Sequence, residues 1–163
     1  MEALKNKYVK LACISGIVVI ADQLTKWAVI KLITLYDVIV LIPGFFNLVH
    51  VQNTGGAFGV FAGQQNTLQS MMFVLVTIIA MCLIVYLYKN TPVEFPILSF
   101  GFSLIFGGAM GNMIDRIRFG RVTDFIDLYV GNLHWPAFNI ADSAITVGMV
   151  IFGYYIIFRK MPV

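Results

Sequence analysis

The chain has 163 residues, of which 60% are hydrophobic and 12% are charged, and its formal net charge is +3. This composition is far more apolar than that of a soluble domain of similar length, so we expect lipid to surround most of the chain. The positive charge is small and scattered, and no basic run alternates with aromatic residues, which argues against a nucleic-acid-binding surface.

Four apolar stretches are each long enough, as a helix, to cross a hydrocarbon core about 30 Å thick. The first stretch carries Asp22 and is followed by no small-x-small cleavage site, which favours a retained span over a cleavable signal peptide. The sequence therefore predicts an all-α membrane protein with one domain over 1–163 and spans at about 9–33, 67–88, 95–114 and 135–158.

The segments 34–66 and 115–134 connect these spans on one side of the membrane, whereas the link between the second and third spans is only a few residues long. Lysines near the N-terminus and Arg159 fall on the cytoplasmic side if both termini are inside, although three arginines of 115–134 then lie outside. The positive-inside rule favours this orientation by a small margin. We expect the functional residues to lie at the outer face.

The segment 34–66 contains two β-prone runs, VIVLI at 38–42 and FFNLVHV at 45–51, separated by Pro43-Gly44. This pattern predicts a small hairpin platform at the membrane surface. The following NTGGAFGVFAG contains four glycines and three large apolar residues, which suggests an interfacial helix. The segment 45–61, rich in Phe and Gly, is a candidate lid. Asn53 and Gly55 either line a groove or form a common turn.

Charged residues within the predicted spans are candidates for function, because an ionised carboxylate at the bilayer centre costs about 2.5–3.5 kcal/mol. Asp142 lies seven residues after Trp135, or about 10 Å along a helix. Asn139, three residues before it, offers an amide to the carboxyl or to a substrate carbonyl. Asp22 and Lys26 stand at i,i+4, a spacing that an internal ion pair also explains.

Asp124 is the second candidate acid, in RVTDFID on the outer loop that leads to the fourth span. Two carboxyls held a few ångströms apart cannot both ionise, so one polarises a scissile carbonyl while the other activates water. The alternative is that Asp124 is a solvated loop acid or a partner of Arg121.

A third cluster closes the third span at Asn112, Asp115 and Arg116. If the helix continues, Asn112 shares a face with both of the others. Arg116 then orients a carboxylate or a lipid phosphate, or is simply a snorkelling interfacial cation. Gly107 and Gly111 form a small-xxx-small pattern that predicts close helix packing.

Metal and phosphate chemistry have no support in the sequence. His50 and His134 are the only histidines and lie in separate loops without ligand spacing, and no Gly-rich phosphate loop is present. We expect no metal and no cofactor.

Two rival functions remain open from the residues alone. A desolvated Lys26 paired with Ser143 or Ser103 would make a Ser/Lys hydrolase. Asp22 and Asp142, both within spans, would also suit a proton relay in a small ion-coupled transporter or channel component.

Taken together, the motifs resemble those of the lipoprotein signal peptidases, also called type II signal peptidases, over nearly the whole chain. Five motifs occur in the family's order on four spans, which makes the resemblance specific: DQLTK at 22–26, NTGGAF at 53–58, GGAMGNMIDR at 107–116, VTDFID at 122–127 and PAFNIADS at 136–143.

The resemblance implies four transmembrane helices with both termini cytoplasmic, an extracytoplasmic β-cradle built from 34–66, and an active site near the outer face of the bacterial inner membrane. It implies an aspartic endopeptidase that cleaves prolipoproteins before a diacylglyceryl-modified cysteine. The expected partners are these substrates and membrane lipids, and the expected state is a monomer.

The resemblance also assigns site residues. Asp124 and Asp142 match the catalytic pair, and Asn112 and Arg116 match residues that line the site. Asp115 is expected to orient Arg116 or to hold the loop. The remaining family positions, which shape or support the pocket, correspond to Asp22, Lys26, Asn53, Gly55 and Asn139.

Overall fold

The computed structural model describes residues 2–55 and 67–159. These residues form four helices that are long and apolar enough to cross a membrane, which confirms the predicted architecture. The helices are α1 (Glu2–Leu32), α2 (Thr67–Asn90), α3 (Pro96–Phe119) and α4 (Ile140–Phe158).

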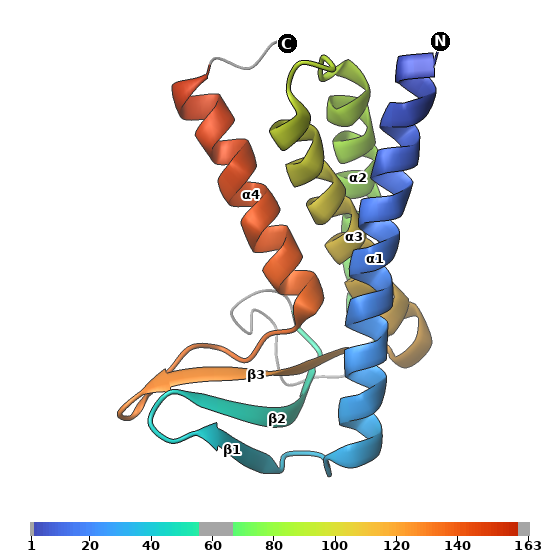
Figure 1. The fold of residues 1–163 in the computed structure, drawn as a ribbon. Helices are drawn as coiled ribbons and strands as arrows, with labels where there is room; N and C mark the ends of the chain where they lie inside the picture. Colours follow the sequence, from blue (N-terminus) through green and yellow to red (C-terminus); the bar gives the residue numbers. More distant parts are fainter. Residues whose placement is uncertain (1, 56–66, 160–163) are drawn as a thin grey trace.

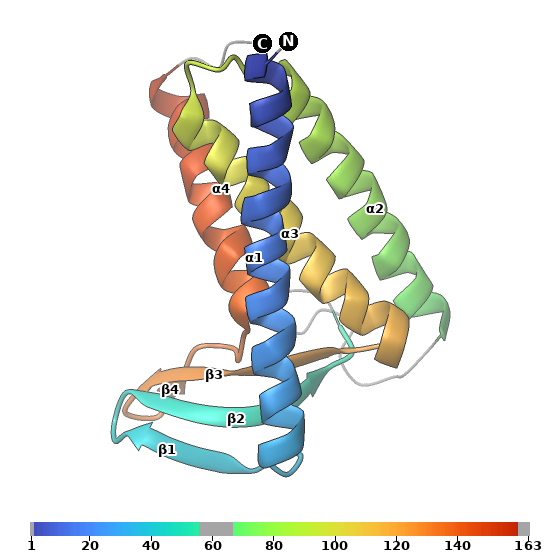
Figure 2. The ribbon, with the colours of Figure 1, turned by 45° about the vertical axis from the view of Figure 1, so that its right-hand side comes forward.

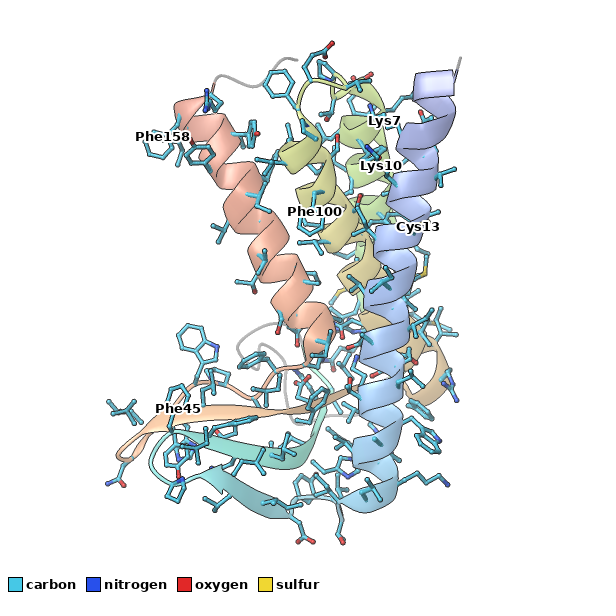
Figure 3. The ribbon with its side chains drawn as sticks, in the orientation of Figure 1. Lys7, Lys10, Cys13, Phe45, Phe100 and Phe158 are labelled. Atoms are coloured by element: carbon cyan, nitrogen blue, oxygen red, sulfur yellow. The ribbon has the colours of Figure 1, made fainter. Side chains whose placement is uncertain are left out.

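The start of α1 and the end of α4 lie at one end of the helix bundle, and the strands lie at the other end (Figure 1). The same separation is visible after rotation (Figure 2). Lys7 and Lys10 mark the end with the termini, whereas Phe45 lies far from them on the sheet (Figure 3). Half of the most apolar part of α3 is buried, against 6% for α2, so α3 is the central helix.

Glycines allow α3 to approach its neighbours closely. A Cβ atom on Gly107 would lie 2.9 Å from Cα of Ser15 on α1. A Cβ on Gly108 would lie 2.3 Å from the carbonyl oxygen of Ala141 on α4. The predicted packing role of Gly107 is therefore confirmed, because no larger residue fits at these backbone contacts.

At the end with the termini, contacts of Lys7 with Tyr88 and Thr91 join α1 to α2 and to the turn between α2 and α3, and we call these contacts the Lys7 clasp. The Lys7 ammonium donates to the carbonyl oxygen of Thr91 and lies 5.0 Å from the centre of the Tyr88 ring. The Tyr88 hydroxyl donates in return to the Lys7 carbonyl at 2.5 Å. Tyr88 belongs to the main apolar core, with Ile84, Leu98, Phe102, Ile105 and Tyr155.

The strands form one antiparallel sheet in the order β1-β2-β3-β4. The predicted hairpin is confirmed as β1 (Val38–Ile42) and β2 (Phe46–Asn53). The other strands are β3 (Val122–Val130) and β4 (Leu133–His134). The sheet therefore includes the second outer segment as well as 34–66. The expectation of a loop around Asp124 was wrong, because β-branched and aromatic residues flank the acids of β3 and favour a strand.

Three boundaries also differ from the prediction, and the first is that helix α1 begins at Glu2 and not at 9. Helix α3 continues beyond 114 to Phe119 and ends at Gly120, which has φ 70°. Helix α4 begins at Ile140 and not at 135, because Asn139 caps it and Phe138 forms a β-bridge with Ile126.

Only part of the expected lid over 45–61 lies within the described residues. Its residues 46–53 form β2, which pairs with β1 on one side and β3 on the other, so this part is a fixed strand of the sheet. The remainder and the expected interfacial helix fall mostly on 56–66, which lie outside the described residues.

Candidate active site

The two predicted acids meet where the sheet joins the helix bundle. Asp124 lies on β3 and is 3% exposed, and Asp142 lies in the first turn of α4. Both carboxyls bind Asn139: its side-chain amide donates to Asp124 at 2.7 Å, and its backbone N–H donates to Asp142 at 3.3 Å. We call Asp124 and Asp142 the dyad.

Asn139 holds Asp142 through the cap of α4. The Asn139 side-chain oxygen accepts from the Asp142 backbone N–H at 2.9 Å, while the Asp142 carboxyl accepts from the Asn139 backbone N–H. This reciprocal arrangement is a capping box, with aspartate in the position usually held by glutamate. Asn139 thus precedes the helix, and the expectation that it shares a helical face with Asp142 was wrong, although the expected contact between them is present.

Asp124 is held by two asparagine side chains, one on each carboxyl oxygen. Asn53 donates to Oδ2 at 3.1 Å and Asn139 donates to Oδ1. Burial and, next, the charge of Asp142 raise the pKa of Asp124 to about 7, against the lowering effect of the two amides and Lys26. The alternative of a solvated loop acid was wrong, and the partners of Asp124 are these amides rather than Arg121.

Asn112 links Asp142 to the predicted ion pair on α1. Its amide nitrogen donates to Asp142 Oδ1 at 2.8 Å, and its amide oxygen accepts from the Lys26 ammonium at 3.0 Å. Each oxygen of Asp142 therefore receives one N–H donor, as each oxygen of Asp124 does.

The Asp22–Lys26 ion pair is confirmed at 2.9 Å, and Asp115 joins it at 3.1 Å from the same ammonium. We call these residues the Lys26 triad. All three side chains are nearly inaccessible, with exposed fractions of 0% to 3%. The pairing offsets the cost of burying charges within the bundle.

The acids of the triad also bind backbone groups of the elements that carry the dyad. Asp22 accepts from the Ala141 N–H on α4 at 3.0 Å. Asp115 accepts from the Thr123 N–H on β3 at 3.1 Å. The triad therefore fixes the residue that precedes each acid of the dyad.

Asp115 was expected either to orient Arg116 or to hold the loop, and its contacts support the second role. Among the described residues, no ion pair joins it to Arg116. The Arg116 guanidinium is half-buried and lies 5.3 Å from the centre of the Phe73 ring on α2. The sequence reasoning gave no role to Gln23, which donates to Asp115 at 2.9 Å. Its place beside Asp22 in a family motif was the available signal.

Asn53 forms the turn that the sequence suggested, and it also reaches the site. Its side-chain oxygen accepts from the Gly55 N–H at 2.9 Å, which leaves its amide nitrogen to face Asp124. The predicted turn is therefore present, and the residue that forms it also contacts Asp124.

A Ser/Lys hydrolase is inconsistent with the observed contacts. The Lys26 ammonium binds the triad acids and Asn112. The hydroxyls of Ser143 and Ser103 instead donate to backbone carbonyls one turn earlier in the chain, at 2.9 and 2.8 Å.

Comparisons with known proteins identify the family of this chain. A family model described as signal peptidase (SPase) II matches residues 14–158. The lipoprotein signal peptidase of Desulforapulum autotrophicum is 49% identical over 154 residues, covering 94% of this chain and 95% of the relative. The lipoprotein signal peptidase of Francisella tularensis subsp. novicida is 41% identical over 156 residues, covering 96% and 94%.

Solved structures show the same fold. A bacterial membrane enzyme solved by the in meso method at 2.3 Å resolution has a TM-score of 0.80 and 34% identity, covering 90% of this chain and 87% of that one. A second, at 1.9 Å resolution, has a TM-score of 0.79 and 32% identity, covering 93% and 94%. The chain is a multi-pass bacterial membrane protein that belongs to the signal peptidase (SPase) II family.

Proposed function

We propose that the protein removes the signal peptide from prolipoproteins by cleaving before their diacylglyceryl-modified cysteine, with Asp124 and Asp142 as the catalytic aspartates. Membership of the signal peptidase II family supports the reaction. The observation that carries the assignment of residues is the binding of both carboxyls to Asn139.

The dyad suits hydrolysis without a covalent intermediate. Because the pKa of Asp124 is about 7 beside Asp142, the pair holds one proton near neutral pH. The ionised carboxyl takes a proton from water as its oxygen attacks the scissile carbonyl carbon, and the protonated carboxyl donates to the carbonyl oxygen. The tetrahedral intermediate then collapses: the C–N bond breaks, the protonated carboxyl donates to the leaving nitrogen, and the ionised carboxyl takes a proton from a hydroxyl of the intermediate, which restores the dyad.

The surrounding amides keep this geometry rigid. Asn53, Asn112 and Asn139 supply N–H donors to the dyad, which hold each carboxyl at a fixed angle before substrate binds. We infer that Arg116 lines the substrate side of the site, and that a single chain suffices for activity, since both aspartates come from it.

We further propose that both termini are cytoplasmic and that the dyad lies near the outer face of the cytoplasmic membrane. The dyad lies on β3 and on the first turn of α4, at the end of the bundle opposite Lys7 and Lys10 (Figure 3). Lysines at that end agree with the positive-inside rule. A site at the outer interface is also where a lipid-anchored substrate presents its peptide bond to water.

The test is a gel-shift assay in detergent with a purified diacylglyceryl-modified preprolipoprotein. We expect wild type to release the signal peptide, and Asp124→Asn and Asp142→Asn each to lower kcat by at least about 100-fold. Asp37→Asn, an exposed acid of the outer segment, is the matched control and retains full activity. Near-normal turnover by either dyad variant would refute the assignment, and no cleavage by folded wild type would refute the reaction.

A further inference from the structure

Lys26 uses every hydrogen-bond donor that it has. Its ammonium lies 2.9 Å from Asp22, 3.1 Å from Asp115 and 3.0 Å from the amide oxygen of Asn112. An ammonium has three N–H donors and no acceptor, so three acceptors satisfy it completely. Lys26 is also 2% exposed, which leaves it no access to substrate.

This saturation determines which way the Asn112 amide faces. Because Lys26 only donates, the amide must turn its oxygen to Lys26 and its NH₂ group to Asp142. The same oxygen also accepts from Asn139 at 3.3 Å, and the Asn139 amide in turn donates to Asp124. Without the cation, only the 3.3 Å contact from Asn139 would hold this oxygen, so the Asn112 amide would be fixed less firmly against the Asp142 carboxyl.

We propose that Lys26 is a positioning residue for peptide hydrolysis, whose ammonium fixes the direction of the Asn112 amide and so the orientation of the Asp142 carboxyl. This inference rests on the proposed function. It gives Lys26 a role beyond pairing with Asp22 and Asp115, because the third N–H points along a chain of hydrogen bonds that ends at the dyad.

The test measures kcat and KM separately, per folded enzyme, in the detergent assay. Lys26→Met removes the cation and keeps a side chain of similar length, but it leaves two buried carboxylates unpaired. The double variant Asp22→Asn/Lys26→Met restores the net charge of the triad, and an asparagine oxygen still accepts from Ala141, so this variant protects the test against simple misfolding.

We expect the double variant to lower kcat about 100-fold, the typical effect of misplacing a reacting group by about 1 Å. KM should stay within about threefold of wild type, because Lys26 does not meet substrate. Lys7→Met is the matched control: it removes another buried lysine of α1, at the opposite end of the bundle, and should leave kcat unchanged.

A double-mutant cycle separates positioning from a purely structural role. If Lys26 acts through Asn112, then adding Asp22→Asn/Lys26→Met to Asn112→Leu should lower kcat by no more than about threefold further. If the losses of kcat instead multiply when the substitutions are combined with Asn112→Leu, the inference is overturned. A kcat near wild type in folded Asp22→Asn/Lys26→Met would also overturn it. Both outcomes require a wild type that cleaves, so they are distinguishable from failure of the proposed function.

Discussion

Gly108→Ala tests how closely activity depends on the contact between α3 and α4. An added Cβ would lie 2.3 Å from the Ala141 carbonyl oxygen and 2.8 Å from the side chain of Ile145. A carbon–oxygen contact normally lies at about 3.3 Å, so the helices must separate locally by about 1 Å. Ala141 directly precedes Asp142, and therefore the displacement reaches the dyad.

We expect Gly108→Ala to lower kcat about 100-fold, because about 1 Å of misplacement is enough for such a loss. Overpacking should also destabilise the fold by about 1–3 kcal/mol. The assay is the detergent cleavage reaction, with kcat expressed per folded enzyme, together with thermal unfolding of the same preparation.

Two glycines of α4 provide graded controls. A Cβ on Gly148 would lie 2.6 Å from the Gly101 carbonyl oxygen, which predicts a similar loss of stability two turns further from the dyad and a smaller loss of kcat. A Cβ on Gly153 meets nothing within 4 Å, so Gly153→Ala should leave kcat unchanged and should not destabilise the fold. Equal losses of kcat in Gly108→Ala and Gly148→Ala, or no loss of kcat in Gly108→Ala, would refute the reasoning.

Four further predictions concern titration and stability. Burial raises the pKa of Asp124 to about 7, above its value in the unfolded chain. The stabilising contribution of this group is therefore present in acid and is lost as the pH rises through about 7. Thermal unfolding of wild type and of Asp124→Asn, each measured against pH, checks this. The dyad loses its shared proton over the same range, so kcat/KM should fall above about pH 7. Asn53→Ala removes an amide that lowers the pKa of Asp124, and it should move this basic limb to higher pH. Lys7→Met should lower stability by about 1–3 kcal/mol, because it leaves the Thr91 carbonyl without its buried donor.

The helices and the first hairpin were predictable because each is encoded within one continuous segment. Apolar length alone identified the spans, and Pro43-Gly44 between two β-prone runs identified the hairpin. Strand β3 was not predictable in this way. Its pairing partner β2 lies far away in sequence, with Asn47 bonding to Asp127 across 80 positions, and its acids interrupt the apolar pattern on which strand prediction depends.

In the site, too, only contacts within one continuous segment could be predicted from the sequence. The spacing of Asp22 and Lys26 on one helix was enough to predict their ion pair. The third member, Asp115, comes from α3, and helical spacing contains no information about contacts between helices. From the sequence alone, Asp115 was expected to act on its neighbour Arg116 or to hold the loop. In the structure, helix packing brings Asp115 into contact with Lys26 and with the Thr123 N–H.

The charged groups of this protein explain why the active site forms only in the assembled bundle. Asp22 and Lys26 on α1 and Asp115 on α3 would each be costly in lipid if the helices were separate. Their mutual pairing therefore favours association of α1 with α3, and their bonds to Ala141 and Thr123 bring α4 and β3 to the same place. The same contacts that offset the cost of burying charge thus position both acids of the dyad. It follows that substitutions in the Lys26 triad should couple stability to activity, whereas the Lys7 clasp, at the other end of the bundle, affects stability alone.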